Sequence, residues 1–393
     1  MNSATRPAGR LLSVAIIFVA ALCSMAQIVP PPPRNGLVLK VDPTDPRAFQ
    51  TIGQAVAAAR RFDVISISSN GNPYNECIDV VGRFDVEFRG SKGKTKVVID
   101  GTGACPASQP AFSISLSRHI YIKNIELMGN PAGTGFFVDH SGDVRLIGVV
   151  ASGFADCGLR TTLSTLATYV EDSIFTDNPG GGFCLNGNGF YFDNVHTDRN
   201  GDAGIQFEGV SGGRGINAWF INLYSGPEQA VGITHGAGAG LDNVAVTRST
   251  FGARGTTPQP GAMGITGSGR YLEVTRASLY GMGINVGASG WLSRNVISDC
   301  PATGIRIGPT PLGMWLQANN VSNCDGLGYD LAGTFAERNI SRENGGGGFL
   351  ARDGVFLERN TARDDGGPGF ARVGTDNAGR GNRSDDAVPP DFE

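Results

Sequence analysis

One short pattern decides the fold: Gly264-Ile265-Thr266, Gly283-Ile284-Asn285 and Gly304-Ile305-Arg306 each place an apolar residue after glycine and a polar residue next. Related segments begin at Gly135, Gly158, Gly182, Gly204, Gly232, Gly328, Gly348 and Gly369. Most copies lie 19 to 24 residues apart, with larger steps around Gly232. Similarity at a fixed period of about twenty residues indicates a solenoid, in which each repeat packs on its neighbours.

A second element lies between the glycine segments and often opens with asparagine, as in Asn194-Val195, Asn295-Val296 and Asn339-Ile340. Each repeat therefore holds short alternating strands that end at Gly, Asn or Asp turns. Leucine-rich repeats share the period, but their leucines at fixed offsets are missing, and 59 glycines in 393 residues disfavour helical repeats. The pattern predicts an all-β parallel β-helix of roughly a dozen coils.

The two ends of the chain differ from the repeats. Arg6 and Arg10, the apolar run from Leu11 to Leu22 and Ser24-Met25-Ala26 are typical of a signal peptide over residues 1–26. We therefore expect a secreted or periplasmic protein with no membrane span after signal removal.

The remaining chain divides into three parts. Residues 27–48 should form a proline-rich linker and a first strand, and residues 49–375 the β-helix. A helix over Phe49–Arg61 should cap its first coil, and residues 376–393 should be a polar tail.

Charge and cysteine content narrow the function further. The net charge of −4 and the lack of a basic patch with interleaved aromatic residues argue against a nucleic-acid partner. Six cysteines follow the signal peptide, and matching positions one coil apart predict the disulfides Cys300–Cys324, Cys157–Cys184 and Cys77–Cys105. The alternative is a set of free, buried thiols. No cofactor is evident, and the sequence gives no prediction of the oligomeric state.

These repeats resemble the right-handed parallel β-helix repeat family of the pectate-lyase-like superfamily. The segment from Phe49 to Val56 also resembles the opening of pectin methylesterase-type enzymes. The resemblance implies a protein that binds an acidic polysaccharide and processes it as a lyase, epimerase or glycoside hydrolase. Val138-Asp139-His140 is similar to a pectate-lyase motif, but the calcium-binding Asp pair and the Arg-x-Pro-x-x-Arg segment are missing.

The third residue of each glycine segment should point outward, because side chains alternate along a strand. This column contains Phe137, Arg160, Cys184, Gln206, Thr234, Thr266, Asn285, Arg306, Asp330 and Leu350. Successive coils lie about 4.8 Å apart, which is close to the length of one sugar residue. The column could therefore follow an extended glycan, although any soluble β-helix also needs a polar outer surface.

Several residues on this surface have chemistry that suits a uronate polymer. Arg160 and Arg306 could neutralise sugar carboxylates, while Gln206 and Asn285 could contribute to substrate binding. Glu208 or His235 could act as a catalytic base. Trp291 could stack on a sugar ring, whereas Trp219 and Trp315 should lie in the core.

Two questions stay open from sequence alone. A recurrent acidic column could bind calcium or could simply form turns, and we favour turns; it contains Asp177, Asp198, Glu228, Asp299, Asp325, Glu343 and Asp364. The protein could be a carbohydrate-active enzyme or a non-catalytic surface, adhesion or periplasmic binding protein. The long interruptions at 209–218, 225–240 and 252–263 could wall a groove, which favours the enzyme.

Overall fold

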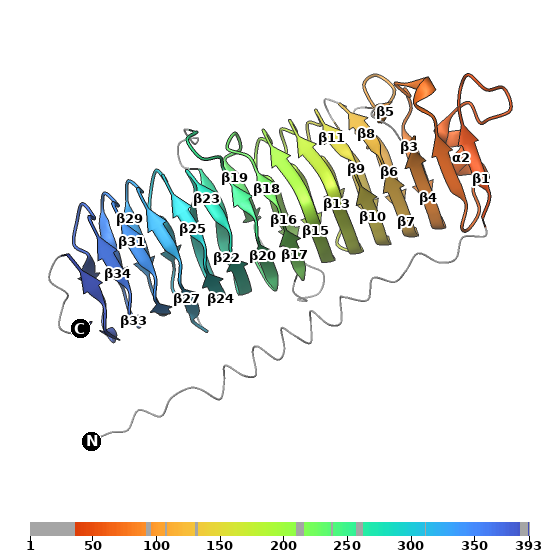
Figure 1. The fold of residues 1–393 in the computed structure, drawn as a ribbon. Helices are drawn as coiled ribbons and strands as arrows, with labels where there is room; N and C mark the ends of the chain where they lie inside the picture. Colours follow the sequence, from red (N-terminus) through yellow and green to blue (C-terminus); the bar gives the residue numbers. More distant parts are fainter. Residues whose placement is uncertain are drawn as a thin grey trace.

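A computed structural model describes residues 36–91, 96–106, 108–129, 133–209, 216–236, 239–256, 262–310, 312–385 and 392. Parallel strands stack into one solenoid that runs from the N-terminal strand β1 (Val38–Val41) to β37 (Arg383–Ser384) (Figure 1). The predicted parallel β-helix is confirmed, with about 14 coils. The predicted signal peptide, residues 1–26, lies outside the described residues.

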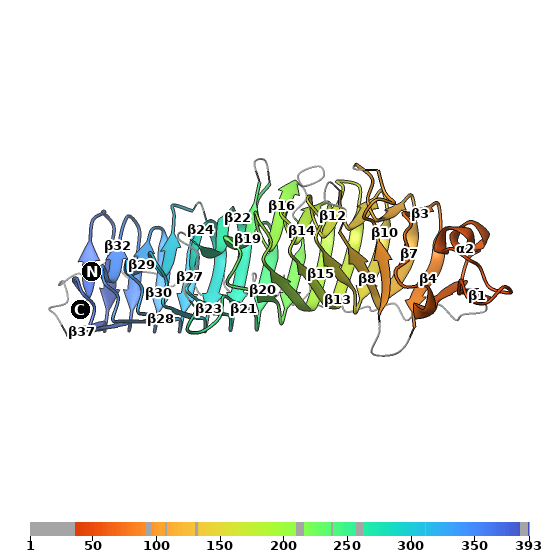
Figure 2. The same cartoon turned by 90° about the horizontal axis from the view of Figure 1, so that it is seen from above.

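Most coils contribute strands to three faces of the solenoid, and Figure 2 shows the stacked coils from above. The first face contains the glycine segments: β3 (Ile78–Val81), β6 (Phe112–Ser115), β9 (Phe136–Asp139), β12 (Leu159–Thr161), β14 (Phe183–Asn186), β16 (Ile205–Gly209), β19 (Val231–His235), the first parts of β22 (Met263–Thr275) and β24 (Gly283–Ser293), β26 (Ile305–Ile307), β29 (Leu327–Leu331), β32 (Gly347–Ala351) and β35 (Phe370–Arg372).

The second face begins with β1 and continues through β2 (Val64–Ile67), β4 (Phe84–Gly90), β7 (Arg118–Lys123), β10 (Gly142–Ile147), the first parts of β13 (Leu166–Thr176) and β15 (Asn188–Asp198), β17 (Ala218–Ile221), β20 (Val244–Thr247), the second parts of β22 and β24, β27 (Met314–Gln317), β30 (Thr334–Glu337), β33 (Phe356–Glu358) and β36 (Ala378–Arg380).

The third face contains β5 (Val97–Asp100), β8 (Ile125–Met128), β11 (Val150–Ser152), the ends of β13 and β15, β18 (Tyr224–Ser225), β21 (Thr250–Phe251), β23 (Ser278–Tyr280), β25 (Val296–Ser298), β28 (Asn320–Ser322), β31 (Ile340–Arg342), β34 (Thr361–Arg363) and β37.

Inward side chains stack along the axis of the solenoid. Ile265 pairs with Ile284, and Ile284 with Ile305, and all three side chains are fully buried, as predicted. In the last coils, Tyr329, Phe349 and Phe370 stack with ring centroids 4.4 and 5.0 Å apart. Full burial of one such side chain contributes roughly 1.5–3 kcal/mol, so one continuous core stabilises all coils together.

A single residue turns the chain from the second to the third face in most coils. This corner residue has a left-handed backbone, with φ between 50° and 64° at Asn124, Gly148, Asp172, Asn194, Asn222, Arg248, Arg276, Arg294, Ala318, Arg338, Arg359 and Gly381. The next residue points into the core. In the C-terminal coils it is a buried asparagine, and together Asn295, Asn319, Asn339, Asn360 and Asn382 form an asparagine ladder.

The ladder satisfies polar groups that the corners would otherwise leave unpaired in the core. The Asn339 side-chain amide donates to the Leu316 carbonyl at 3.1 Å and to the Asn360 side-chain oxygen at 3.0 Å. Its own oxygen accepts the Asn319 backbone N–H at 3.0 Å and the Asn319 amide at 2.9 Å. Each rung therefore fixes the register of two neighbouring coils.

Both ends of the stack are covered. Helix α2 (Ile52–Ala58) lies within the predicted cap, and the Thr51 side chain accepts the Gln54 N–H at 3.1 Å as its N-cap. At the other end the expected polar tail is wrong in part, because β36 and β37 continue the coils past residue 375. The physical reason is that Asn382 extends the ladder and donates to the carbonyl of the buried Phe392 at 2.6 Å.

We predict that Asn339→Ala lowers the free energy of unfolding by about 2–4 kcal/mol, because it leaves buried partners on both neighbouring coils unsatisfied. Denaturant unfolding followed by circular dichroism measures the loss. Asn320→Ala is the matched control, since Asn320 is exposed on the third face, and it should cost about 0.5 kcal/mol or less. Equal effects of the two substitutions would contradict a structural role for the ladder.

Candidate functional site

The predicted outward column forms one continuous row on the first face, which we call the strip. Arg160 pairs with Cys184, Cys184 with Gln206, and Gln206 with Thr234. Beyond this, Thr266, Asn285, Arg306, Asp330 and Leu350 pair in the same order as in the sequence. Thr234 and Thr266 follow the paired residues Ile233 and Ile265, so the row is unbroken.

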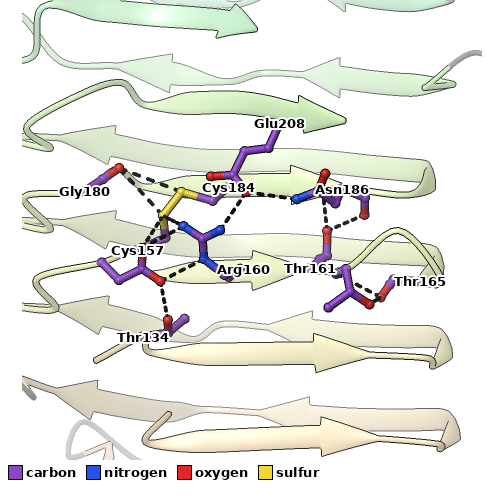
Figure 3. A network of polar contacts seen from close by, with 11 residues as sticks. Thr134, Cys157, Arg160, Thr161, Thr165, Gly180, Cys184, Asn186 and Glu208 are labelled. Atoms are coloured by element: carbon purple, nitrogen blue, oxygen red, sulfur yellow. Dashed lines mark hydrogen bonds and ion pairs between the residues drawn. A yellow bond between two sulfur atoms is a disulfide. The ribbon is translucent and has the colours of Figure 1, made fainter. Parts of the chain in front are cut away.

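Arg160 is the centre of a polar network at the N-terminal part of the strip (Figure 3). Its Nε and Nη2 atoms donate to the two carboxylate oxygens of Asp156 at 2.8 and 2.7 Å, and its Nη1 atom donates to Glu208 at 2.6 Å. Glu208 also accepts the Asn186 amide at 2.9 Å, and Asp156 accepts the Thr134 hydroxyl at 2.6 Å. The guanidinium therefore holds two carboxylates in place.

The protonation of this network follows from its contacts. Hydrogen bonding to Asp156 raises the pKa of Arg160 above its usual value. Burial raises the pKa of Asp156, but the hydrogen bonds from Arg160 and Thr134 outweigh burial and leave it below its usual value. One guanidinium and two carboxylates give the network a formal charge of −1. Arg160 is thus committed to carboxylates of the protein itself, which leaves it little positive charge for an acidic sugar.

A β-bulge places Glu208 in this network. Leu185 pairs with Phe207, but Asn186 pairs with Gly209, so Glu208 is an extra residue in its strand. A bulge re-aims the side chain that it carries. The sequence identified Glu208 as a candidate site residue. It did not predict the contact of Glu208 with Arg160, which lies 48 residues away in the chain.

The disulfide Cys157–Cys184 lies beside Arg160 and joins the coils of β12 and β14 (Figure 3). Asp156 and these two sulfur atoms lie close enough together to suggest a metal site. Sulfur atoms bonded to each other are not thiolates, so this group does not offer thiolate ligands. The other disulfides are Cys77–Cys105 and Cys300–Cys324, and all three pairs match the pairing expected from sequence.

His235 has a structural contact at each ring nitrogen. Its Nε2 atom accepts the backbone N–H of Ser268 at 2.8 Å, and its Nδ1 atom lies 2.9 Å from the carbonyl of Gly236. Because the amide must donate and the carbonyl must accept, the ring is a neutral Nδ1–H tautomer with no free lone pair. A side chain at Gly267 would collide with this ring. His235 therefore fastens β19 to the neighbouring coil, and the contacts do not favour its predicted role as a base.

The polar side chains in the middle of the strip, unlike those around Arg160, have no hydrogen-bond partners among the described residues. Gln206, Thr234, Thr266 and Asn285 are half-buried and follow one another in consecutive coils. Within the part of the chain that the structure describes, none of these side chains makes a hydrogen bond, although the side chains around Arg160 are fully engaged. The row thus offers donors and acceptors to an external partner.

The C-terminal part of the strip carries positive charge. Asp330 is buried and accepts Arg352 Nη2 at 2.9 Å. Arg306 lies at 3.5 Å from the same carboxylate, and its side chain is 56% exposed. Two guanidinium groups thus share one carboxylate, and Arg306 is the more available of the two predicted arginines.

Trp291 belongs to a different surface, an outward aromatic column on the second face. It stacks on Trp315 with ring centroids 5.1 Å apart and an interplanar angle of 14°. Trp315 contacts Phe335, and Phe335 stacks on Phe356 at 5.3 Å. Because neighbouring rings cover each other's faces, the column offers mainly ring edges to a sugar.

The expected core position of Trp219 and Trp315 is wrong, since both alternate with buried residues and face outward. Each tryptophan lies three positions before the corner residue of its coil. This constant offset is the signal in the sequence that could have identified the outward position. Stacking of large rings on the outer surface explains why apolar residues are tolerated there.

The acidic column of the sequence lies at turns. Asp177, Asp299, Glu343 and Asp364 all have left-handed backbones, with φ between 52° and 60°. The Asp177 carboxylate accepts Arg199 at 2.7 Å, and that of Asp299 accepts Asn323 at 2.6 Å. These contacts support the turn interpretation, and calcium binding stays a prediction.

Comparison with known proteins agrees with this geometry. A family model for the right-handed β-helix region matches residues 110–257. The chain therefore has a right-handed parallel β-helix fold. No curated protein matches the sequence of this β-helix. Within its described residues, no helix has the length and apolar character that a membrane span requires.

Solved structures share the β-helix at low sequence identity. The catalytic domain of a GH87 α-1,3-glucanase in complex with nigerose is 14% identical, with a TM-score of 0.53, and the match covers 90% of this chain and 70% of that one. A single-residue variant of such a domain gives 15% identity, a TM-score of 0.54 and the same coverage. The A-module of the Azotobacter vinelandii mannuronan C-5 epimerase AlgE6 is 14% identical, with a TM-score of 0.44 and coverage of 86% and 93%.

We predict that Arg160→Ala lowers the free energy of unfolding by about 2 kcal/mol at pH 7, because Asp156 and Glu208 are left as unpaired carboxylates. A carboxyl group with a lowered pKa contributes stability above its unfolded pKa, about 3.9, and loses it as the pH falls. The difference between wild type and variant should therefore shrink toward pH 3.

Urea unfolding at pH 7 and pH 3 checks this expectation. Arg199→Ala is the control, because its ion pair with Asp177 is exposed and should contribute less than about 1 kcal/mol. A loss in Arg160→Ala that stays constant with pH would show that the carboxylates are not its cause.

Proposed function

We propose that this chain is an exported protein that binds an extended acidic polysaccharide along the strip. The observation that carries the proposal is the row of four unpaired polar side chains at Gln206, Thr234, Thr266 and Asn285. Backbone pairing fixes them one coil apart, at about 4.8 Å, so each can meet one sugar residue. A glycan that runs along the solenoid would satisfy them with its hydroxyl groups.

The rigidity of the row favours binding. Each of the four residues sits on a strand that pairs on both sides, and half-burial already restricts its side chain. A partner therefore meets groups that lose little further conformational entropy on binding. Similar hydroxyl and amide groups on mobile loops would have to be ordered first.

Charge supports an acidic sugar at one end of the row. Arg306 follows Asn285 directly in the strip and extends an exposed guanidinium from a cluster with net charge +1. A planar guanidinium can donate two parallel hydrogen bonds to a uronate carboxylate. The negative Arg160 network at the other end would orient such a polymer by repulsion.

Three disulfides support the proposed export, since they persist mainly in secreted and periplasmic proteins. The fold supports a carbohydrate partner by analogy alone: the similar structures include a glucanase with a bound disaccharide and a mannuronan epimerase.

A second function, hydrolysis of a glycan, is favoured by one observation. Asp156 and Glu208 contact the same guanidinium, and hydrolases use two carboxyl groups about 5 to 9.5 Å apart. Arg160 fills the space between them, however, and so we place binding first. Loss of turnover in Glu208→Gln with binding retained would support hydrolysis.

We predict that Asn285→Ala weakens binding of a soluble polyuronate such as alginate about 5- to 10-fold, which corresponds to one lost hydrogen bond. Arg306→Ala should weaken alginate binding by at least as much and leave a neutral dextran unaffected. Affinity electrophoresis of the folded variants measures both effects. Asn320→Ala, an outward asparagine on the third face, should bind like wild type, and equal binding by all variants would refute the strip.

A further inference from the structure

A second basic surface runs along the corner between the second and third faces. Its residues are Arg248, Arg276, Arg294, Arg338 and Arg359, which we call the ridge. All five are exposed and occupy the corner position of their coils, with Ala318 as a single interruption. These coils lie in the C-terminal half of the solenoid, from β20 to β33 (Figure 1).

The backbone keeps the ridge in register. The N–H of Arg248 donates to the Thr275 carbonyl at 3.1 Å, and the N–H of Arg276 donates to the Ser293 carbonyl at 3.0 Å. The preceding residues Thr247, Thr275 and Ser293 pair directly with one another. Successive arginines of this part therefore begin about 4.8 Å apart along one line.

Arginine is a costly choice at this position. A left-handed backbone costs an ordinary L-residue roughly 1–2 kcal/mol, whereas Gly, Asn and Asp adopt it readily. The earlier coils use those favourable residues at the corner, namely Asn124, Gly148, Asp172, Asn194 and Asn222. The later coils replace them with arginine five times, so local backbone energy does not explain the choice.

The first three arginines are also unpaired. Among the described residues, no carboxylate lies within ion-pair distance of Arg248, Arg276 or Arg294, and their side chains make no hydrogen bond. Arg338, by contrast, lies 3.3 Å from Glu337, and Arg359 lies 4.0 Å from Glu358. The ridge thus has a free part of charge +3 and a part whose charge is largely compensated.

We propose that the ridge is a second binding site, independent of the strip, for a linear acidic polysaccharide with one carboxylate on each sugar. Three guanidinium groups at one-coil spacing match a polymer whose charges recur about every 5 Å. The phosphates of a nucleic-acid duplex recur every 3.4 Å along each strand, which is a poorer match. A chain of uronates would lie along the corner and pair with Arg248, Arg276 and Arg294 in turn.

The test compares two sets of Arg→Asn substitutions in the mature chain. Arg248→Asn/Arg276→Asn/Arg294→Asn removes the free part of the ridge, and Arg338→Asn/Arg359→Asn is the matched control. Binding is measured with sodium alginate at low and high salt, in a background that already carries Asn285→Ala and Arg306→Ala. This background removes the strip, so failure of the ridge and failure of the strip remain distinguishable.

The triple variant should lose alginate affinity at least 10-fold at low salt, while the control loses less than 3-fold. Because asparagine favours the left-handed backbone, the Tm of the triple variant should be equal to or higher than that of the parent that carries only Asn285→Ala and Arg306→Ala. Lysine at the same three positions should restore most of the binding.

Three outcomes would overturn the proposal. Unchanged alginate affinity in the triple variant would remove the site. A lower Tm would show that the arginines serve the fold. Tighter binding of a DNA duplex or of phosphatidylglycerol vesicles than of alginate, lost in the same variant, would assign the ridge to a different polyanion.

Discussion

Hydrogen bonds between neighbouring coils at the corners set the register on which the surfaces of this molecule depend. In the C-terminal coils the residue after the corner is an asparagine, whose side chain enters the core and must find polar partners above and below it, as Asn319 and Asn339 do. A slip of one residue would break these bonds and would turn every outward side chain of that strand inward.

Because the register is fixed, equivalent positions of successive repeats align, and side chains of similar chemical character form straight rows along the solenoid. Gln206 and Thr234 lie side by side because their strands pair residue by residue, and the same rule aligns Trp291 with Trp315. The aromatic column and the arginine ridge come from neighbouring positions of the same coils, three residues apart. The solenoid can thus carry different surfaces on different faces without any change in the core.

The sequence was sufficient to predict the features that depend only on the repeat. The period predicted the stacking of Ile265 on Ile284 and the bonding of Cys300 to Cys324, because both depend only on positions one coil apart. It failed where a local irregularity decides, as at the bulge that turns Glu208 toward Arg160. It also failed at Phe392, where a residue far beyond the last repeat covers the core.

The arginine ridge and the asparagine ladder occupy adjacent positions, and this arrangement has a physical reason. Arg294, Arg338 and Arg359 each precede a ladder asparagine, whose buried side-chain hydrogen bonds stabilise the corner beside them. The coils up to Asn222 lack the ladder at this position and use Gly, Asn or Asp at the corner, where no backbone cost needs to be offset. At Arg294, Arg338 and Arg359 the ladder therefore helps to hold a charged residue in a conformation that it disfavours. Arg248 and Arg276 precede Ser249 and Ala277 instead, so the ladder does not account for arginine at those two corners, and selection for charge is the simplest reason to keep it there.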